Sequence, residues 1–323
     1  MSEENRQLNF KDCLDTIQVI EKPVREGLGE DSFYCAESNN SAIVSVFDGC
    51  GGLGARKYDS FSGKSGAYIA SRIVSGAVRD WYRGFKDTKW TGSQELANSL
   101  EGYIKSAYEI CERYAEDGRR VLGTMVRDFP TTMAFVYAEM KEDILLTILW
   151  AGDSRVYMLS ETGLRQLTKD DTDIEDALEN LTKDGAMHNV LSSDKEYQIN
   201  RKTFRIANPG IVFAATDGCF GYFSSPMEFE YYVLKTIVES DTPESFRDAL
   251  RSLFEMYAGD DFTLGMMSFY YGTYDDTRKS LRKRLNFVEQ NYIIPLERNQ
   301  TGSTRQKLWE KYKKGYEQYL ELV

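Results

Sequence analysis

Acidic residues end several apolar, strand-like runs in this 323-residue chain, and glycines stand beside most of them. In residues 43–57, IVSVFDGCGGLGARK, Asp48 follows a β-branched and aromatic run, and four glycines occupy the next six positions. Glycine lets a backbone turn tightly and approach a ligand closely. Comparable acidic residues stand in GLGEDSF, WAGDSRVY, AATDGCF and GDDFTLG, as Glu30 with Asp31, Asp153, Asp217, and Asp260 with Asp261.

Carboxylates repeated in this way could form a metal site. Their oxygens are the ligands that hard cations such as Mg²⁺ and Mn²⁺ prefer. Two such ions, roughly 3.5–4 Å apart, orient a water molecule, lower its pKa and stabilise an in-line displacement at phosphorus. Each stretch taken alone is also compatible with an ordinary turn, because Asp-Gly is a common hairpin dipeptide. The residues by themselves leave both interpretations open.

The histidine and cysteine content excludes other chemistries. His188 is the only histidine, so multi-histidine metal sites are excluded, as is any Ser-His-Asp or Cys-His catalysis that does not use His188. The five cysteines are odd in number and scattered, without a CxxC pair, which argues against structural zinc and against a disulfide framework. We therefore expect a reducing, cytoplasmic location, and the polar N-terminus shows no secretory signal.

The overall composition restricts the class of partner. Hydrophobic residues make up 41% of the chain and charged residues 28%, which is typical of a globular protein. The net charge of −11 argues against general nucleic-acid binding. The longest apolar run, DILLTILWAGD, is far too short to cross a bilayer. We expect neither a nucleic-acid nor a membrane partner.

The acidic residues must be positioned by a mixed set of strands and helices. Apolar and β-branched runs predict strands over residues 16–21, 32–36, 42–48, 132–139, 144–153, 155–159, 211–216 and 263–271. Apolar residues at helical spacing predict helices over residues 64–82, 94–115, 227–239 and 244–257. The two long helices are consecutive, and the strands around them pair without a helix between each one. This order predicts an α+β fold with helices outside antiparallel sheets.

The last fifty residues differ in charge from the rest of the chain. Residues 274–323 carry 11 basic and 7 acidic side chains, although the whole chain is acidic. A terminal helix is predicted by four apolar or aromatic residues at four-residue spacing, Leu308, Tyr312, Tyr316 and Leu320. Packing of this helix on the acidic body is favoured, and a partner-binding arm is the alternative. The predicted division is a main domain, residues 1–272, and a basic, helical C-terminal extension, residues 273–323.

Taken together, the acidic stretches resemble the metal-dependent serine/threonine protein phosphatases of the 2C family, in their bacterial form. The matching segments are GEDSFY, VFDGCGG, FPTTMAFVYAE, LLTILWAGDSRVYML, LRQLTKDDTD, FAATDGCF and GDDFTLGMMSF. They occur in the family's order and span about residues 15–270, so the group is far more specific than one Asp-Gly pair. The resemblance implies a four-layer α-β-β-α sandwich, two antiparallel sheets flanked by helices, with a two-metal site at one end.

The resemblance also implies the ligands of two Mn²⁺ or Mg²⁺ ions. Asp48 matches the carboxylate that bridges both ions, and the carbonyl of Gly49 matches a ligand of one of them. Asp217 and Asp260 match the remaining direct carboxylate ligands of the other ion. Asp48 and Asp217 are thus expected to be essential for catalysis.

Further acidic residues match the surroundings of the two ions. Glu30 and Asp31 match residues that hold metal-bound waters. Asp153 matches a residue implicated in a third, weaker metal site. Many members carry an acid four positions after the aspartate of the TDG motif, where this chain has Gly221. The third site is therefore expected to be weak.

Other positions depart from the family pattern. Members commonly place a phosphate-binding arginine where this chain has Glu26, and Arg25 lies one residue upstream. We assign that catalytic role to Arg25, because a loop can absorb a shift of one residue. Cys50 stands where eukaryotic members have a histidine, which favours the bacterial type. His188 falls in a variable region and is expected to be structural.

The resemblance implies a phosphatase that hydrolyses phosphoserine and phosphothreonine in proteins with a metal-activated water. Its expected partner is a phosphorylated protein substrate, such as a Ser/Thr kinase or the target of one. One alternative is a catalytically weak regulatory module of the same fold that binds a phosphoprotein or a kinase. Lost metal ligands would mark such a module, and the sequence retains them. Another alternative is an enzyme with one narrow substrate, such as a phosphorylated regulator of a stress or defence pathway.

Overall fold

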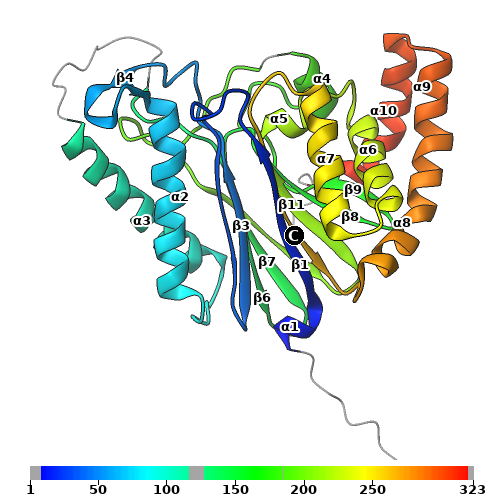
Figure 1. Ribbon diagram of the computed structural model, residues 1–323, viewed down its shortest axis with the longest axis horizontal. Coiled ribbons are helices and arrows are strands. Elements are labelled where there is room, and N and C mark those ends of the chain that lie inside the picture. The colour runs from blue at the N-terminus through cyan, green and yellow to red at the C-terminus, as the bar shows by residue number, and fades with distance from the viewer. Residues whose placement is uncertain (1–8, 116–126, 184, 319–323) are drawn as a thin grey trace, which may run out of the picture.

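The computed structural model describes residues 9–115, 127–183 and 185–318, which form two packed antiparallel sheets (Figure 1). Sheet A has the strand order β1 (Leu14–Lys22), β12 (Phe262–Phe269), β11 (Gly210–Ala215), β8 (Arg155–Ser160) and β9 (Gly163–Gln166). Sheet B has the order β10 (Asn200–Ile206), β7 (Ile144–Ala151), β6 (Met133–Met140), β3 (Ser41–Phe47) and β2 (Ser32–Glu37). A small ladder pairs β4 (Lys57–Tyr58) with β5 (Lys64–Ser65).

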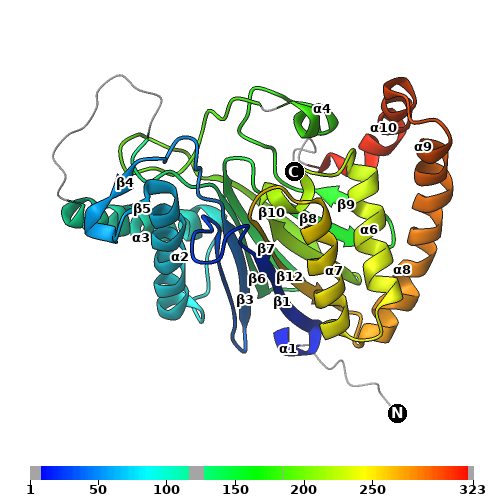
Figure 2. The same ribbon diagram turned by 45° about the horizontal axis from the view of Figure 1, so that its top comes forward.

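Helices cover both outer faces of the two sheets (Figures 1 and 2). Sheet B is covered by α2 (Gly66–Phe85) and α3 (Ser93–Tyr114). Sheet A is covered by α6 (Pro226–Glu239), α7 (Pro243–Tyr257) and α8 (Tyr274–Val288), with α9 (Ile294–Arg298) and α10 (Gly302–Tyr316) beyond them. Short helical segments are α1 (Phe10–Cys13), η1 (Asp59–Phe61), α4 (Ala177–Thr182), α5 (Asp217–Phe220) and the π-helical η2 (Glu289–Ile293). The α+β class and the four-layer sandwich are confirmed.

Local sequence explains the main elements of these layers. All residues of β3 and β11 are buried, because both strands lie inside their sheets and are covered on both faces. Along α2, buried apolar residues recur every three or four positions, and the N-cap Ser65 side chain accepts a hydrogen bond from the Tyr68 N–H. A proline in the first turn starts both α6 and α7. The predicted strands and long helices therefore form, with ends displaced by a few residues.

The C-terminal extension packs on the body of the protein. Trp309, Tyr312 and Tyr316 of α10 are buried in one apolar cluster with residues of sheet A, α6 and α7. The Glu230 carboxylate of α6 binds the Arg284 guanidinium of α8 at 2.8 Å. Leu320, which was predicted to continue the helix stripe, lies outside the described residues. None of the helices in the described part of the chain is long and apolar enough to cross a membrane.

Candidate metal centre

The candidate acidic residues gather at one end of the sandwich because strand register aligns the ends of their strands. In sheet B, the last residue of β3 pairs with the first of β2, so Asp48 and Asp31 lie side by side. In sheet A, the last residue of β11 pairs with the first of β8 and the third of β12. Asp217, Asp153 and Asp260 therefore meet at the same end of the sheets.

The carboxylates at this end act on one another electrostatically. Burial raises the pKa of Asp48 well above its ordinary value, and the charges of Asp217, Asp31, Asp153 and Asp260 raise it further. Burial also raises the pKa of Asp217, with Asp260 as the leading charge. A site that holds several buried carboxylates together is destabilised by their repulsion unless protons or cations neutralise them. The five residues form what we call the acidic centre.

Asp31 and Asp153 illustrate how burial and neighbouring charges raise a carboxyl pKa in the acidic centre. Burial raises the pKa of Asp31 to about 8, although the Thr216 hydroxyl donates to its Oδ2 at 2.8 Å and favours the charged form. Burial, followed by the charge of Asp217, raises the pKa of Asp153 to about 8. The Oδ1 atom of Asp153 is buried without a hydrogen-bond partner. Such an oxygen can be satisfied by a cation.

The donor set of the acidic centre fits hard divalent cations, since it consists of carboxylate oxygens. Its geometry is more open than a finished metal site. Among the residues that the structure describes, no three Asp, Glu, His or Cys side chains converge closely enough to hold one ion together. The chemistry of the donors therefore fits Mn²⁺ or Mg²⁺, and ion binding would have to draw the carboxylates together.

The backbone around Asp48 is fixed by two threonines. The Thr131 hydroxyl and the Thr132 N–H both donate to the carbonyl oxygen of Asp48, at 2.7 and 2.8 Å. The N–H of Asp48 donates to the Thr132 hydroxyl at 3.2 Å. These bonds leave the carboxylate of Asp48 as the free group of the turn. Sequence analysis matched this FPTT segment to the family without assigning either threonine a role.

The glycines after Asp48 permit close approach of neighbouring segments. A Cβ atom on Gly51 would lie 2.3 Å from Oε2 of Glu30, and one on Gly49 would lie 2.5 Å from the Ala67 carbonyl oxygen. The turn can therefore pack against the Glu30 carboxylate only because Gly49 and Gly51 carry no side chains. The Ser65 hydroxyl donates to Oε1 of Glu30 and holds that carboxylate in place. Burial raises the pKa of Glu30 as well.

Asp261 positions the loop that carries Arg25 and Glu30. Its Oδ1 accepts from the Val24 N–H at 2.6 Å and its Oδ2 from the Glu30 N–H at 2.5 Å. Sequence analysis noted Asp261 beside Asp260 but gave it no role. Arg25 itself is exposed and makes no ion pair with a residue in the described ranges. The role of Arg25 in phosphate binding stays a prediction.

Cys50 and His188 contribute little to the chemistry of the acidic centre. Burial, followed by the charges of Asp48, Asp153 and Asp217, raises the pKa of the Cys50 thiol well above its ordinary value. The thiol therefore stays protonated and is a poor nucleophile near neutral pH. His188 is exposed, and its backbone N–H donates to the Asp171 carbonyl oxygen at 2.9 Å.

A pocket of about 310 Å³ opens beside the acidic centre, which we call the acidic-side pocket. Asp153 and Asp217 lie on one side of it, while Asn180 of α4 and the adjoining Lys183 lie on the other. Gly221, at the position of the absent family carboxylate, also lines it. The pocket places space for a ligand directly beside the candidate metal ligands.

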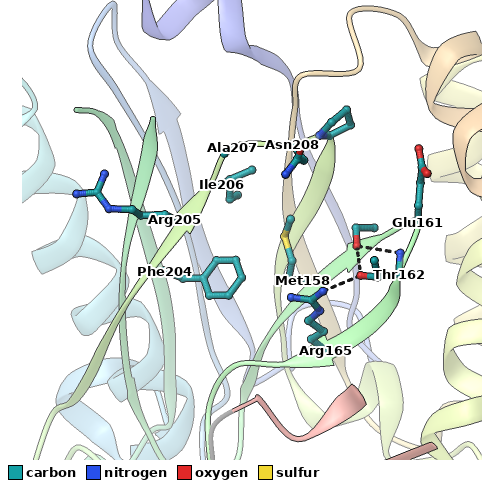
Figure 3. Close-up of a pocket in the computed structure, with 11 residues that line it drawn as sticks. Met158, Glu161, Thr162, Arg165, Phe204, Arg205, Ile206, Ala207 and Asn208 are labelled. Carbon is teal, nitrogen blue, oxygen red and sulfur yellow. Dashed lines mark hydrogen bonds between the residues drawn. The ribbon is translucent and has the colours of Figure 1, made fainter. Parts of the chain in front are cut away.

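A second pocket, of about 330 Å³, lies at the opposite end of the sheets, between the β8–β9 hairpin and the β10–β11 connection (Figure 3). Met158 and Phe204 form apolar walls, and the Arg165 guanidinium donates to the Thr162 hydroxyl at 2.7 Å. Glu161 is the one carboxylate among its described lining residues, so this pocket is no candidate metal site.

Solved structures share the fold of this chain. Serine/threonine phosphatase Stp1 from Staphylococcus aureus matches with a TM-score of 0.59 and 18% identity, over 84% of this chain and 99% of that one. The Mycobacterium tuberculosis serine/threonine phosphatase PstP/Ppp matches with a TM-score of 0.55 and 17% identity, over 80% and 98%. The PstP catalytic domain in complex with two manganese ions matches with a TM-score of 0.53 and 15% identity, over 80% and 98%. The fold expected from the resemblance is confirmed.

Sequence comparison gives a more limited match. A Mycoplasma genitalium protein described as "Putative protein phosphatase" is 28% identical over 158 residues, which are 46% of this chain and 50% of that protein. The chain thus spans about half the length of this curated relative. No family model matches the chain. About a fifth of this chain has no counterpart in the PstP structures, which are themselves matched almost completely.

Proposed function

We propose that this protein is a metal-dependent phosphatase that hydrolyses phosphoserine and phosphothreonine in proteins. The observation that carries the proposal is the acidic centre, in a fold shared with bacterial serine/threonine phosphatases. Its five carboxylates lie beside strand ends at one end of the sandwich, and burial and neighbouring charges raise the pKa values of four of them, Asp48, Asp31, Asp153 and Asp217. When bound, two Mn²⁺ or Mg²⁺ ions supply Lewis acidity, lower the pKa of water and neutralise phosphoryl charge.

The residues of this chain would have distinct roles toward the metal ions and the phosphoryl group. Asp48 would bridge the two ions with the Gly49 carbonyl beside it, and Asp217 and Asp260 would complete the direct ligands. Glu30, Asp31 and Asp153 would hold waters or a weaker third ion, and exposed Arg25 would bind the phosphoryl group. These assignments are summarised by the set Asp48, Gly49, Asp217, Asp260, Glu30, Asp31, Asp153 and Arg25.

The surroundings of the acidic centre fit this division. Bonds from Thr131 and Thr132 hold the backbone of the Asp48 turn, which limits how far its carboxylate must move to meet an ion. Burial and the neighbouring carboxylates raise the pKa of the Cys50 thiol, which makes it a poor nucleophile and agrees with attack by a water molecule. The five cysteines are all free, which agrees with a reducing, cytoplasmic location. A Ser/Thr kinase or its target is the proposed source of the phosphorylated substrate.

The test is hydrolysis of a phosphothreonine peptide and an aryl phosphate by the full chain, with Mn²⁺ and with chelator. We expect turnover only with metal, and at least ~10²-fold lower turnover in Asp217→Asn, because the substitution removes an ionic ligand. An exposed matched variant, Asp248→Asn, should retain activity. Turnover that is unaffected by chelation would contradict the proposal.

A second candidate is a catalytically weak regulatory module that binds a phosphoprotein. It is favoured by the open arrangement of the acidic centre, in which no three described side chains converge on one point. Calorimetric titration with Mn²⁺ separates the two candidates. Two tight ions with turnover support the phosphatase, whereas peptide binding without metal binding or turnover supports the module.

A further inference from the structure

The C-terminal helix α10 contacts the helix that closes one side of the acidic-side pocket. The indole N–H of Trp309 donates to Oδ2 of Asp176 at 2.9 Å, and the Lys313 ammonium lies 3.8 Å from the same oxygen. Trp309 has no exposed surface, so the donor side of this bond is buried, while the Asp176 carboxylate is half-buried. Asp176 lies immediately before α4, at the edge of the pocket.

Asp176 also starts helix α4. Its Oδ1 accepts from the N–H groups of Leu178 and Glu179, at 3.0 and 3.1 Å, which caps the helix. One carboxylate thus uses one oxygen to begin α4 and the other to attach α4 to α10. A helix of six residues has little stability of its own, so its position depends on such contacts.

The other end of the contact chain lies at the acidic centre. Asn180 of α4 donates to Oδ2 of Asp170, and the same carboxylate pairs with the buried Arg155 guanidinium at 2.7 Å. Arg155 lies two residues after Asp153 and stacks over the ring of Phe220, with its carbon Cζ 4.3 Å from the ring centre. The position of α4 is therefore coupled to side chains that border the metal ligands.

Helix α10 reaches the same arginine by a second route. The Tyr316 hydroxyl lies 3.5 Å from the Tyr157 hydroxyl, which accepts from Nη1 of Arg155 at 3.2 Å. One helix of the extension thus contacts residues directly behind both sides of the acidic-side pocket, Asp176 before α4 and Tyr157 beside Arg155. The route through Tyr316, Tyr157 and Arg155 is buried, and the route through Asp176 is anchored by the buried Trp309 indole, so α10 holds both contacts in a fixed geometry.

We propose that α10 positions α4 at the acidic-side pocket through the hydrogen bond from Trp309 to Asp176, which makes Trp309 a positioning residue for the bound substrate. The segment of a phosphoprotein that flanks the phosphorylated residue would lie against α4 and Lys183, beside the metal ions. A small aryl phosphate would not reach α4. The role of Trp309 in positioning the substrate rests on the proposed phosphatase function. The attachment of α4 to α10 does not depend on that function.

Two variants remove the bond with little other change. Trp309→Phe keeps an aromatic ring and removes the donor. Asp176→Asn keeps an oxygen for the α4 cap and turns an N–H₂ group toward the indole N–H. The matched control is Tyr312→Phe, which removes a buried bond of the same helix, to Oε2 of Glu230 at 2.6 Å, without touching α4.

Hydrogen exchange of the metal-free full chain gives a readout that is independent of activity. Amides of residues 177–183 should exchange at least ~10-fold faster in both variants, because a bond to a charged group is lost. The double variant should add nothing to the single ones. Tyr312→Phe should destabilise the protein globally but leave exchange in this segment unchanged. Unchanged exchange in both variants, or equal acceleration in the control, would overturn the proposal.

Kinetics then test the consequence for substrate. With Mn²⁺, KM for a phosphothreonine peptide should rise several-fold in Trp309→Phe and Asp176→Asn, while KM for the aryl phosphate changes less. Equal changes for both substrates would overturn the positioning role. If α4 exchanges faster but wild type hydrolyses nothing, the phosphatase function fails and the attachment of α4 stands.

Discussion

Replacement of Asp48 by asparagine should affect the metal-free and the manganese-bound protein in opposite directions. In the metal-free protein, Asp48 is half-buried beside four other carboxylates; burial raises its pKa, and the four neighbouring charges raise it further. Asparagine removes the charge from nearly the same volume. We therefore expect Asp48→Asn to have a higher Tm than wild type in chelator, measured by scanning calorimetry.

The pKa values of Asp31 and Asp153 set the scale of this effect. Both pKa values are raised from 3.8 to about 8. At pH 7 the folded protein therefore keeps each carboxyl group protonated at a pH roughly three units above its ordinary pKa. At ~1.4 kcal/mol per unit, the upper bound is on the order of 4 kcal/mol. Hydration and relaxation reduce it, so about 2 kcal/mol is the scale we take for removing one carboxylate from the acidic centre. With an unfolding entropy of about 0.7 kcal/mol/K for the chain, Tm rises by about 3 °C.

The same raised pKa values determine how the stability of the metal-free protein changes with pH. The folded acidic centre binds protons more tightly than the unfolded chain, so its contribution to stability is complete below about pH 4. That contribution is lost as the pH rises through the folded value of about 8. In chelator, the Tm of wild type should therefore fall between pH 5 and pH 8. The fall should be smaller in Asp48→Asn.

Manganese should reverse the order of the Tm values of wild type and Asp48→Asn. At a concentration of about 100 times Kd, binding should stabilise wild type by ~2.7 kcal/mol and raise its Tm by about 4 °C. Asp48→Asn should lose most of this shift, because it lacks the charge proposed to bridge the ions. Asp248→Asn, on the exposed surface of α7, should behave like wild type. A variant at Asp48 with a lower Tm in chelator and an unchanged manganese shift would refute the reasoning.

Two further substitutions test the surroundings of the acidic centre. Arg155→Met should lower the free energy of unfolding by ~3–5 kcal/mol in a denaturant titration, because it leaves the buried Asp170 carboxylate without its cation, whereas Lys279→Met at an exposed ion pair should have no measurable effect. Gly221→Asp should raise the affinity for a third Mn²⁺ in calorimetric titration, and Gly221→Asn should not. The Gly221 φ of −66° admits any residue, although its Cβ would lie 2.9 Å from the Asp217 carbonyl oxygen and must shift slightly.

The acidic residues could be located from the sequence because each adjoins a strand end. Antiparallel register brings such ends together, as the pairing of β11 with β8 and β12 does for Asp217, Asp153 and Asp260. The same logic does not apply to Arg25, whose position depends on a loop conformation that no periodicity encodes, so its role in phosphate binding stays a prediction. Asp261 was missed as a positioning residue for a similar reason. In a DD pair the sequence does not tell which carboxylate faces the site and which binds the loop.

Strands β9 and β10 and helix α4 were not predicted. The segment NRKTFRI of β10 alternates between an outer face with Arg201 and Arg205 and an inner face with Phe204 and Ile206, but its charges obscure the pattern. It lies at the edge of sheet B, where one partner strand suffices and apolar content can be low. Helix α4 is one short turn and a half, held by Asp176 and by tertiary contacts rather than by its own sequence.

The structure also bears on the alternative role of the extension as a partner-binding arm. Glu230 of α6 has no exposed surface, and its carboxylate accepts hydrogen bonds from Arg284 of α8, Tyr312 of α10 and the Leu164 N–H. The only cation in this set comes from the extension, so removing the extension would leave a buried charge unpaired. Helix α10 also places the side chain of Trp309 in the core, where it has no exposed surface.

A partner could therefore reach only the opposite face of α10, which carries the exposed Lys307, Lys311 and Lys314. An interaction there would be electrostatic and would weaken with salt. The aromatic stripe that suggested a binding arm in the sequence is instead the surface by which the extension completes the core of sheet A. Binding of a partner through that stripe would require α10 to leave the body, which would expose Trp309 and release the contact with Asp176. The extension is thus better understood as part of the packed body of the protein than as an appended arm.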